Sequence, residues 1–442
     1  MPQMPPSVSG AGPLLGHARE FLSSPETVLR RGYDEHGKIF RLRLPGPPGI
    51  VLLGPEHSRF LFAETDKRLS IRRAYPFFVH MFGADAYFLA DEGEYKRQRD
   101  IVLPRLQSRQ MEGHVAVMDG LTRTLIDELG DDGEIDLVNT LGPHVMNVAT
   151  RCFLGSNLSN RIGDSFFAVF RRFSEGLDPL IPGWIPVPKM VRCHRARDQL
   201  RTVIGDVIRE RRQHPLEPAD FLQVLTEAEY ANGEPVPDHR LVNLILMMIW
   251  VGYETTNGHL AWSFIDLLQN PRELQKVFDE QRRMLDPAEP LTVKRMHQLP
   301  VLDRAVHETE RLHPVTVVIA RRAVETIEYA GYRIPKGAVV MVPPSLTHRM
   351  PDVFPDPDRF HPDRYLDDPK VMKQLVGFGG GLHRCLGVQF AYQEIKLTVT
   401  RLLQRFDLEL VDTAPIPAAG QTTKWPQSPC RVRYRRRVDA VL

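Results

Sequence analysis

The sequence predicts a mainly α-helical protein with small β-sheets, an α+β fold built as one large unit. Helical patterns dominate from about Pro55 to Leu299, the strand-like stretches are short and scattered, and no internal repeat or low-complexity segment divides the chain. The 37 prolines are about 8% of the residues against a usual ~5%, and their dispersal is typical of helix boundaries. We therefore expect a single domain over residues 1–442, with β-rich parts near 38–54, 327–342 and 406–435.

Composition excludes several classes of protein. The chain has 442 residues, and 57 Lys and Arg against 55 Asp and Glu leave a formal net charge of +2, without the basic excess of a nucleic-acid-binding protein. No apolar run reaches the roughly 18 residues that span a bilayer. Residues Met1–Gly16 have neither the basic nor the apolar part of a signal peptide. We expect a cytoplasmic protein with no transmembrane anchor and no nucleic-acid partner.

Short apolar runs around Gly and Pro predict local hairpins. We expect strands at Ile39–Leu44 with Ile50–Leu53, within Ile327–Val342 around a turn at Pro335-Lys336-Gly337, and at Phe406–Val411 with Cys430–Tyr434.

One long helix is expected from about Asp238, a good N-cap, to Asn270, which precedes a proline. About 33 residues at a rise of 1.5 Å give a helix of about 48 Å, enough to cross a domain. Its first half is apolar nearly all round, which indicates a buried central helix. The segment Gly252-Tyr253-Glu254-Thr255-Thr256 then interrupts the apolar pattern. Either the helix simply emerges from the core there, or Gly252 lets a group approach the backbone beside an acid and a hydroxyl that relay protons.

The cysteines lie far apart in the sequence, at positions 152, 193, 385 and 430, and they form neither a disulfide framework nor a C-x-x-C pair. Cys385 belongs to the glycine-rich segment Gly377–Gly387. That segment is not a phosphate loop, because Leu382 stands where a glycine is needed, and it is not a zinc site, because no second cysteine lies at ligand spacing. A solitary cysteine is usually an inert hydrophobe.

The neighbours of Cys385 favour a metal-bound thiolate instead. Phe378, the glycines, His383 and Arg384 offer an aromatic shield, close amides and positive charge. A helix that starts after Gly387 would also direct its N-terminal dipole at the sulfur.

Together these residues make the chain resemble the cytochrome P-450 family of haem-thiolate monooxygenases, over nearly its whole length. The resemblance rests on motifs in the right order: Gly252–Thr256 in the long central helix over the haem, Glu308-Thr309-Glu310-Arg311, Pro357-Asp358-Arg359-Phe360, Tyr95 with Arg99, and Phe378–Gly387 with Cys385 as the implied axial ligand of the iron.

Glu308 and Arg311 are three residues apart and share a helix face. On a surface such a pair would contribute about 0–1 kcal/mol. In a buried cluster with Arg359 it would be a structural lock, because breaking a buried pair costs about 3–5 kcal/mol. His307 and Glu308 do not begin a metalloprotease motif, since the fifth position is Arg311 and not histidine.

The resemblance implies haem b as the cofactor. The residues that it assigns to the haem are Cys385, His383, Arg99, Tyr95, Arg321, Tyr75, Phe378 and Gly252, of which Arg99, Tyr95, His383, Arg321 and Tyr75 would meet the propionates.

Within the family the chain is most similar in look to the sterol 14-demethylase branch in its soluble bacterial form. His383 stands where most members have arginine, and Tyr75-Pro76-Phe77-Phe78 and Phe82-Gly83 also match that branch. The branch has a histidine where this chain has Glu254, and its signature after Phe-Gly is broken at Ala84–Phe88. The pair Glu254 and Thr255 is that of ordinary hydroxylases.

The implied reaction inserts one atom of O2 into a bulky apolar substrate, such as a sterol, terpenoid, fatty acid or polyketide. Thr255 would hold the bound peroxide and a water, and Glu254 would deliver protons. Candidates for the substrate wall are Phe77, Phe78, Met81, Phe82 and Tyr253, although such residues are often plain core.

Electrons would come from a separate donor, a ferredoxin with its reductase or a similar partner, because about 55 residues follow the loop and a reductase domain is larger. A basic face that includes Arg384 would suit an acidic ferredoxin. Two alternatives stay open: a haem-thiolate binding or sensor protein, against which Glu254 and Thr255 count, and a peroxide-using or isomerising haem enzyme on the same fold.

Overall fold

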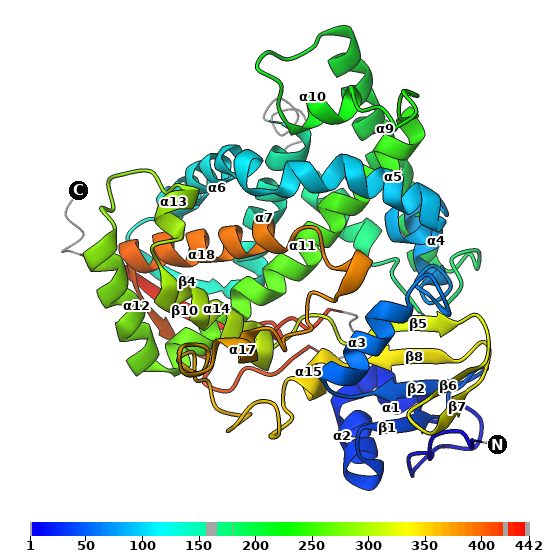
Figure 1. Cartoon of the computed structure of the whole chain (residues 1–442). Helices are drawn as coiled ribbons and strands as arrows, with labels where there is room; N and C mark the ends of the chain where they lie inside the picture. Colours follow the sequence, from blue (N-terminus) through cyan, green and yellow to red (C-terminus); the bar gives the residue numbers. More distant parts are fainter. Residues whose placement is uncertain (1, 156–165, 180, 419–422, 438–442) are drawn as a thin grey trace.

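The computed structural model describes residues 2–155, 166–179, 181–418 and 423–437 (Figure 1). A five-stranded sheet lies at one side of the molecule, and most of the helices lie at the other. Its strand order is β1-β2-β8-β5-β3, in which only β2 and β8 are parallel. The strands are β1 Ile39–Leu42, β2 Gly49–Leu52, β3 Leu69–Ser70, β5 Ile319–Ala323 and β8 Val339–Val342.

Two smaller sheets complete the strands. A three-stranded antiparallel sheet has the order β4-β10-β9, and a two-stranded hairpin pairs β6 with β7. The strands are β4 Asp132–Asp136, β6 Ile327–Tyr329, β7 Tyr332–Ile334, β9 Phe406–Leu410 and β10 Arg431–Arg436.

The first and last predicted hairpins are confirmed as β1–β2 and β9–β10. The hairpin predicted within 327–342 exists, but the predicted position of its turn is wrong. The hairpin turns at Ala330-Gly331, both with positive φ, and Pro335–Gly337 instead lead to β8, which pairs with β2 and β5 in the large sheet. The β2 pairing joins segments almost 300 residues apart, which no local pattern could indicate.

Helices make up most of the chain, and proline stands in the first turn of α2, α3, α9, α12 and α14, where its missing N–H costs nothing. The α-helices are α1 Ala18–Ser23, α2 Pro25–His36, α3 Pro55–Glu64, α4 Val79–Phe82, α5 Glu92–Val102, α6 Ser108–Leu129, α7 Leu137–Leu154, α9 Pro188–Gln213, α10 Phe221–Thr226, α11 Asp238–Gln269, α12 Pro271–Met284, α13 Val293–Met296, α14 Pro300–Leu312, α15 Pro344–Thr347, α16 Arg364–Asp367, α17 Pro369–Met372 and α18 Val388–Arg405. Short 3-10 turns are η1 Pro76–Phe78, η2 Tyr87–Leu89, η3 Leu103–Leu106 and η4 Gly381–His383.

The long helix α11 runs through the middle of the helical part, as expected, in contact with α7, α9, α14 and α18 (Figure 1). Its residues 241–250 are all buried, and all of them except Asn243 belong to the largest apolar cluster of the core. Burial then stops for one turn: Val251 is 37% exposed, and Gly252, Glu254 and Thr255 are partly exposed, before the helix is buried again from Thr256. The central helix therefore has an open face at the predicted position.

Among the described residues, no helix is both long enough and apolar enough to cross a membrane. The division of the chain into domains stays a prediction.

Candidate functional site

The loop before α18 surrounds the sulfur of Cys385. The Cys385 N–H donates to the carbonyl of Phe378 at 2.9 Å, which closes the loop, and the backbone N–H of Gly387 donates to the sulfur. Because α18 begins at Val388, its N-terminal dipole points at the same atom, as predicted. Burial raises the pKa of the thiol, and the Gly387 N–H and the Arg384 charge oppose that rise. Although protein atoms surround the thiol closely enough to raise its pKa, Cys385 keeps an exposed surface that the other three cysteines lack, so it can reach a ligand.

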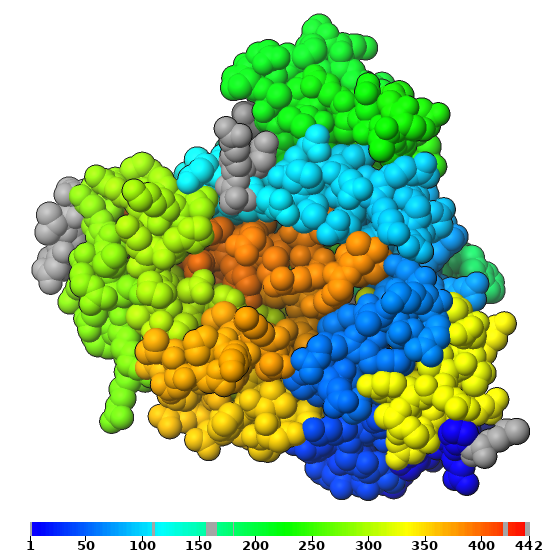
Figure 2. Space-filling model, viewed as in Figure 1, coloured from blue at the N-terminus to red at the C-terminus, as the bar shows by residue number. Residues whose placement is uncertain are grey.

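Glycines let this loop lie close against α3. Gly379 and Gly381 have φ of +71° and +64°, a region that other residues rarely adopt. A Cβ on Gly380 would lie 2.4 Å from a ring carbon of Phe62. Figure 2 shows the C-terminal part of the chain that holds the loop, in orange, beside the blue N-terminal segments and the cyan α5–α6 region.

A second group of side chains meets the loop from α5. The Tyr95 hydroxyl donates to the carbonyl of Leu382 at 3.0 Å, and its ring stacks on that of His383 with the centroids 4.1 Å apart. His383 Nε2 pairs with Asp66, while its Nδ1 is buried without a partner. Arg99, one turn after Tyr95, likewise has a buried Nε without a partner.

Arg321 and Tyr75 are brought together by β5. The Arg321 side chain is buried, which lowers the pKa of its guanidinium, and its Nε donates to Thr65 Oγ1 at 2.9 Å. The Tyr75 hydroxyl accepts the N–H of Ala320 at 2.9 Å. Thr65 binds Arg321, and the adjacent Asp66 binds His383, so these two residues connect the two groups of predicted propionate partners.

Sequence reasoning missed Thr65 and Asp66. Asp66 has φ of +66°, unusual for a residue other than glycine, and lies 317 positions from His383 in sequence. No signal in the sequence relates the two residues.

The open face of α11 holds the predicted acid and alcohol. The Thr255 hydroxyl donates to the carbonyl of Val251 at 2.7 Å, which leaves its lone pairs free to accept. Burial raises the pKa of Glu254 to about 7, and a hydrogen bond with Ser174 opposes the rise. Ser174 in turn accepts the indole N–H of Trp250 at 3.0 Å. Ser174 and Val251, which sequence reasoning missed, complete this part of the site.

The interpretation of Gly252 as a point of close approach is wrong. A Cβ there would lie 3.7 Å from Phe153 and 3.8 Å from Ala149, ordinary contacts with α7. The missing side chain therefore faces the neighbouring helix and clears no space for a ligand.

Replacing Gly252 with alanine is therefore expected to stabilise the protein by about 0.5–1 kcal/mol, because alanine has the higher helix propensity and fits without strain. Chemical unfolding of the variant and parent checks this. A loss of stability or of bound haem would contradict the contact geometry.

Most of the predicted substrate wall is core. Met81 and Phe82 are 0% exposed, and Tyr253 packs between Phe170 and Trp425, on the side of α11 away from Val251. Phe82 packs against Phe173 and Trp250, and Met81 has no exposed surface, so these three residues belong to the packed core of the structure.

The other two residues of the predicted substrate wall are Phe77 and Phe78. Phe78 is 8% exposed and contacts Trp250 at 5.3 Å between centroids, and Phe77 is partly exposed. Phe78 thus lies against the central helix and Phe77 packs on Phe78 at 4.8 Å between centroids, and the role of both in a substrate wall stays a prediction.

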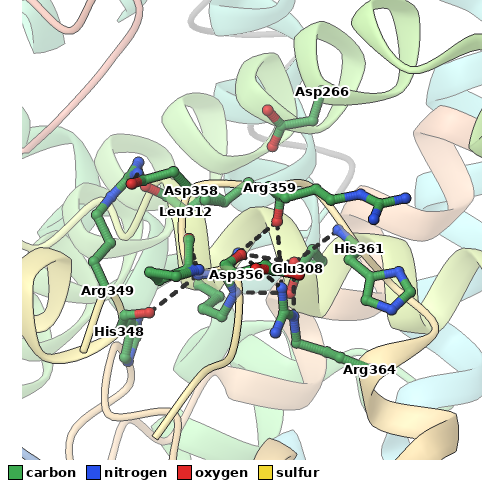
Figure 3. A network of polar contacts seen from close by, with 12 residues as sticks. Asp266, Glu308, Leu312, His348, Arg349, Asp356, Asp358, Arg359, His361 and Arg364 are labelled. Atoms are coloured by element: carbon green, nitrogen blue, oxygen red, sulfur yellow. Dashed lines mark hydrogen bonds and ion pairs between the residues drawn. The ribbon is translucent and has the colours of Figure 1, made fainter. Parts of the chain in front are cut away.

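The Glu308–Arg311 pair is fully buried and bidentate, with N–O distances of 2.9 and 2.8 Å (Figure 3). The predicted third member is wrong. Arg359 is exposed and contributes only its carbonyl, which accepts from Arg311 at 2.9 Å, whereas the side chain of Arg364 donates to Glu308 at 3.0 Å. Arg364 starts α16, where its guanidinium also binds the carbonyls of the preceding loop, including that of Pro355.

Glu310 connects this cluster to the cysteine loop. Its buried carboxyl accepts hydrogen bonds from the Tyr392 hydroxyl and the Gly377 N–H, and burial raises its pKa. The Tyr392 ring also contacts Phe378 at 5.2 Å. Helix α14 thus holds the loop that carries Cys385.

These residues fit an iron porphyrin. A thiol offers the soft anionic ligand that haem iron takes in this kind of site, and Arg99 Nε and His383 Nδ1 are buried polar atoms that still need an acceptor or donor. Among the described residues, no group of three His, Cys, Asp or Glu side chains could hold a metal ion without the porphyrin.

Comparison with known proteins agrees with this chemistry. Residues 5–431 match the family model described as Cytochrome P450. The chain belongs to the cytochrome P450 family. This P450 is 30% identical to the sterol 14alpha-demethylase of Mycolicibacterium vanbaalenii, over 98% of each chain, and 28% identical to the lanosterol 14-alpha demethylase of Bos taurus, over 98% of this chain and 88% of the relative.

The fold of this P450 matches that of the retinoic acid-bound cyanobacterial CYP120A1, with a TM-score of 0.90, 28% identity and coverage of 99% and 100% of the two chains. Members of the family bind haem b, so the expected cofactor, the fold and the activity of a haem monooxygenase are confirmed.

Proposed function

We propose that this P450 hydroxylates a bulky apolar substrate with electrons from a separate ferredoxin-type donor, and that Glu254 and Thr255 deliver the protons. The observation that carries the proposal is Glu254: an acid on the open face of α11, next to a hydroxyl, with a pKa of about 7. A group with that pKa exchanges protons readily near neutral pH. The haem, held by Cys385, supplies the activation of O2.

In this proposal the chain's own groups act in sequence. Thr255 accepts a hydrogen bond from a water or from the reacting species, since its own proton is held by the Val251 carbonyl. Glu254, which is partly exposed, passes a proton to that water and recovers one from solvent, while Ser174 holds its carboxyl by a hydrogen bond. Tyr95, Arg99, His383, Arg321 and Tyr75 hold the haem propionates.

Ser174 is a positioning residue for Glu254 in this scheme. Its hydrogen bond lowers the pKa of Glu254 against the effect of burial, so Ser174→Ala is expected to raise that pKa further. Coupled turnover depends on protonated Glu254 and falls as pH rises through about 7 in the parent. In Ser174→Ala the coupled turnover is expected to fall at a higher pH than in the parent. Ser174→Thr, which keeps the hydroxyl, is expected to restore the pH profile of the parent. A uniform loss of rate with no shift along the pH axis would remove Ser174 from this role.

The relatives suggest candidate substrates, and Glu254 suggests the type of reaction. The relatives named above are sterol demethylases, and sterols are therefore among the candidate substrates of this chain. Glu254 favours a simple hydroxylation, because it supplies a proton donor beside Thr255. The partly exposed Phe77 supplies apolar contact.

The separate electron donor is proposed from charge. Arg384 is exposed directly before Cys385, where an acidic ferredoxin would lie closest to the iron ligand.

Reconstituted turnover tests the function. The haem-loaded protein is supplied with NADH, a ferredoxin and its reductase under ¹⁸O2, or with hydrogen peroxide alone, and the products of a sterol, terpenoid and fatty-acid panel are measured by mass spectrometry. One ¹⁸O atom per product with the ferredoxin system is expected. Product with peroxide only would favour the peroxide-using alternative, and spectral binding without any product would favour the sensor.

A further inference from the structure

A cavity of about 490 Å³ lies between the η1–α4 segment and the part of the five-stranded sheet that contains β5, which lie next to each other in Figure 1. This volume is within the range of small-molecule sites. Its lining consists of Arg72, Arg73, Pro76, Val79, Ala84, Arg322, Ala323, Lys336 and Gly337. Four of these residues are cations and none is acidic.

A neighbouring cavity shows that the lack of acids is specific to the first one. The second cavity, of about 250 Å³, shares Arg72 and Ala84 with it but contains three acids and three arginines in all. There the charges pair: Arg240 contacts Glu94 at 2.7 Å, and Arg97 contacts Glu94 at 3.0 Å.

Three of the four cations of the first cavity have no such partners, whereas the charge of Arg72 also acts on Asp91 of the second cavity. Within the part of the chain that the structure describes, Arg73, Arg322 and Lys336 form no ion pair, and Arg322 is fixed only by its Nε, which donates to the carbonyl of Gly337 at 3.2 Å. Like charges that share a cavity repel one another, and a bound anion relieves that repulsion. Arginine pairs of this kind bind carboxylates bidentately.

The cavity lies beside a segment that packs on the central helix α11. Pro76 and Val79 form its wall, and Phe78 between them contacts Trp250 on α11, four residues before Glu254. A molecule whose head lies among the cations therefore needs only to pass residues 76–79 for its apolar part to approach the open face of α11.

We propose that the substrate of this P450 is an amphipathic carboxylic acid, whose carboxylate is held by Arg72, Arg73, Arg322 and Lys336. This inference rests on the proposed function and specifies its substrate class. The cavity is then an anchoring site that fixes which part of the apolar body reaches the haem.

Ligand binding tests the proposal through the spin-state shift of the ferric haem and, independently, through calorimetry. The probes are dodecanoic acid, retinoic acid and cholanic acid, each compared with its own methyl ester. At least one acid is expected to bind about tenfold or more tightly than its ester, and the difference is expected to shrink between 50 and 500 mM salt. Esters that bind as well as the acids in all three pairs would overturn the proposal.

Substitutions test whether the cations of the cavity cause the preference for acids over esters. Arg73→Gln with Lys336→Gln changes two exposed side chains, so folding should be retained, and it is expected to abolish the acid-over-ester preference while leaving the affinity for the ester unchanged. Arg272→Gln, an equally exposed cation on α12, is the matched control and should keep the preference. A preference that survives the double variant would contradict this site.

The two proposals fail separately. A haem protein that oxygenates neutral substrates without preferring acids keeps the proposed function and loses this inference. A protein that binds acids at Arg73 and Lys336 but yields no oxygenated product keeps the carboxylate-binding site, and it loses both the proposed function and the acid as its substrate.

Discussion

Replacing Arg364 with methionine is expected to lower the free energy of unfolding by about 3–5 kcal/mol, because the Glu308 carboxylate would keep its charge in the interior and lose one of its two guanidinium partners. Arg364 also donates to the carbonyls of Pro355 and Asp356, which would lose a partner too. Since the same loop lies against α14, the variant should also retain less haem.

Arg359→Met provides the matched control. The Arg359 side chain is exposed and only its carbonyl takes part, so we expect a change within about 0.5 kcal/mol. Arg364→Lys, which keeps the charge with fewer donors, should fall between the two. Unfolding midpoints and haem content of the three variants are the measurement. A larger loss from Arg359→Met than from Arg364→Met would contradict the cluster in Figure 3.

Thr255→Ala is expected to separate electron use from product formation. In the proposed mechanism the water that receives the proton of Glu254 then loses the hydroxyl that accepts its hydrogen bond, so NADH is still consumed but product per NADH is expected to fall about tenfold or more. Glu254→Gln removes the acid itself and should slow coupled turnover by about 10²-fold, the usual size of a general-acid contribution.

Thr256→Ala is the control for the threonine variant. Thr256 is the next residue but is only 2% exposed, within the core, so its loss should leave the product yield per NADH unchanged. Product and NADH consumption are measured together in the reconstituted system. Equal yields for Thr255→Ala and the parent would remove Thr255 from the mechanism.

Much of the site could be predicted because its chemistry is local in sequence. The loop of Cys385, the Glu308–Arg311 pair and the acid–alcohol pair each lie within one turn or loop, where spacing fixes geometry. The long central helix followed in the same way, from one continuous apolar run with a proline stop, although the predicted N-cap Asp238 is wrong: the N-cap is Pro237, and Asp238 is the first residue of the helix.

The rest depends on contacts between distant segments. Whether Arg359 or Arg364 reaches Glu308 depends on how the loop between them turns, and both residues look alike in sequence. Ser174 meets Glu254 only because the helical residues 166–174 pack on α11. The face that Gly252 presents to α7 likewise follows from helix packing, which a single helix pattern does not determine.

The central claim is that Cys385 binds the haem iron as a thiolate. The most direct test is the carbon monoxide spectrum of the reduced, haem-loaded protein. The strongly red-shifted Soret band of a thiolate complex is expected in the parent and in Cys430→Ala, whose cysteine is buried away from the loop, and it should be lost in Cys385→Ala. The same band in Cys385→Ala, or no such band in the parent, would contradict the assignment.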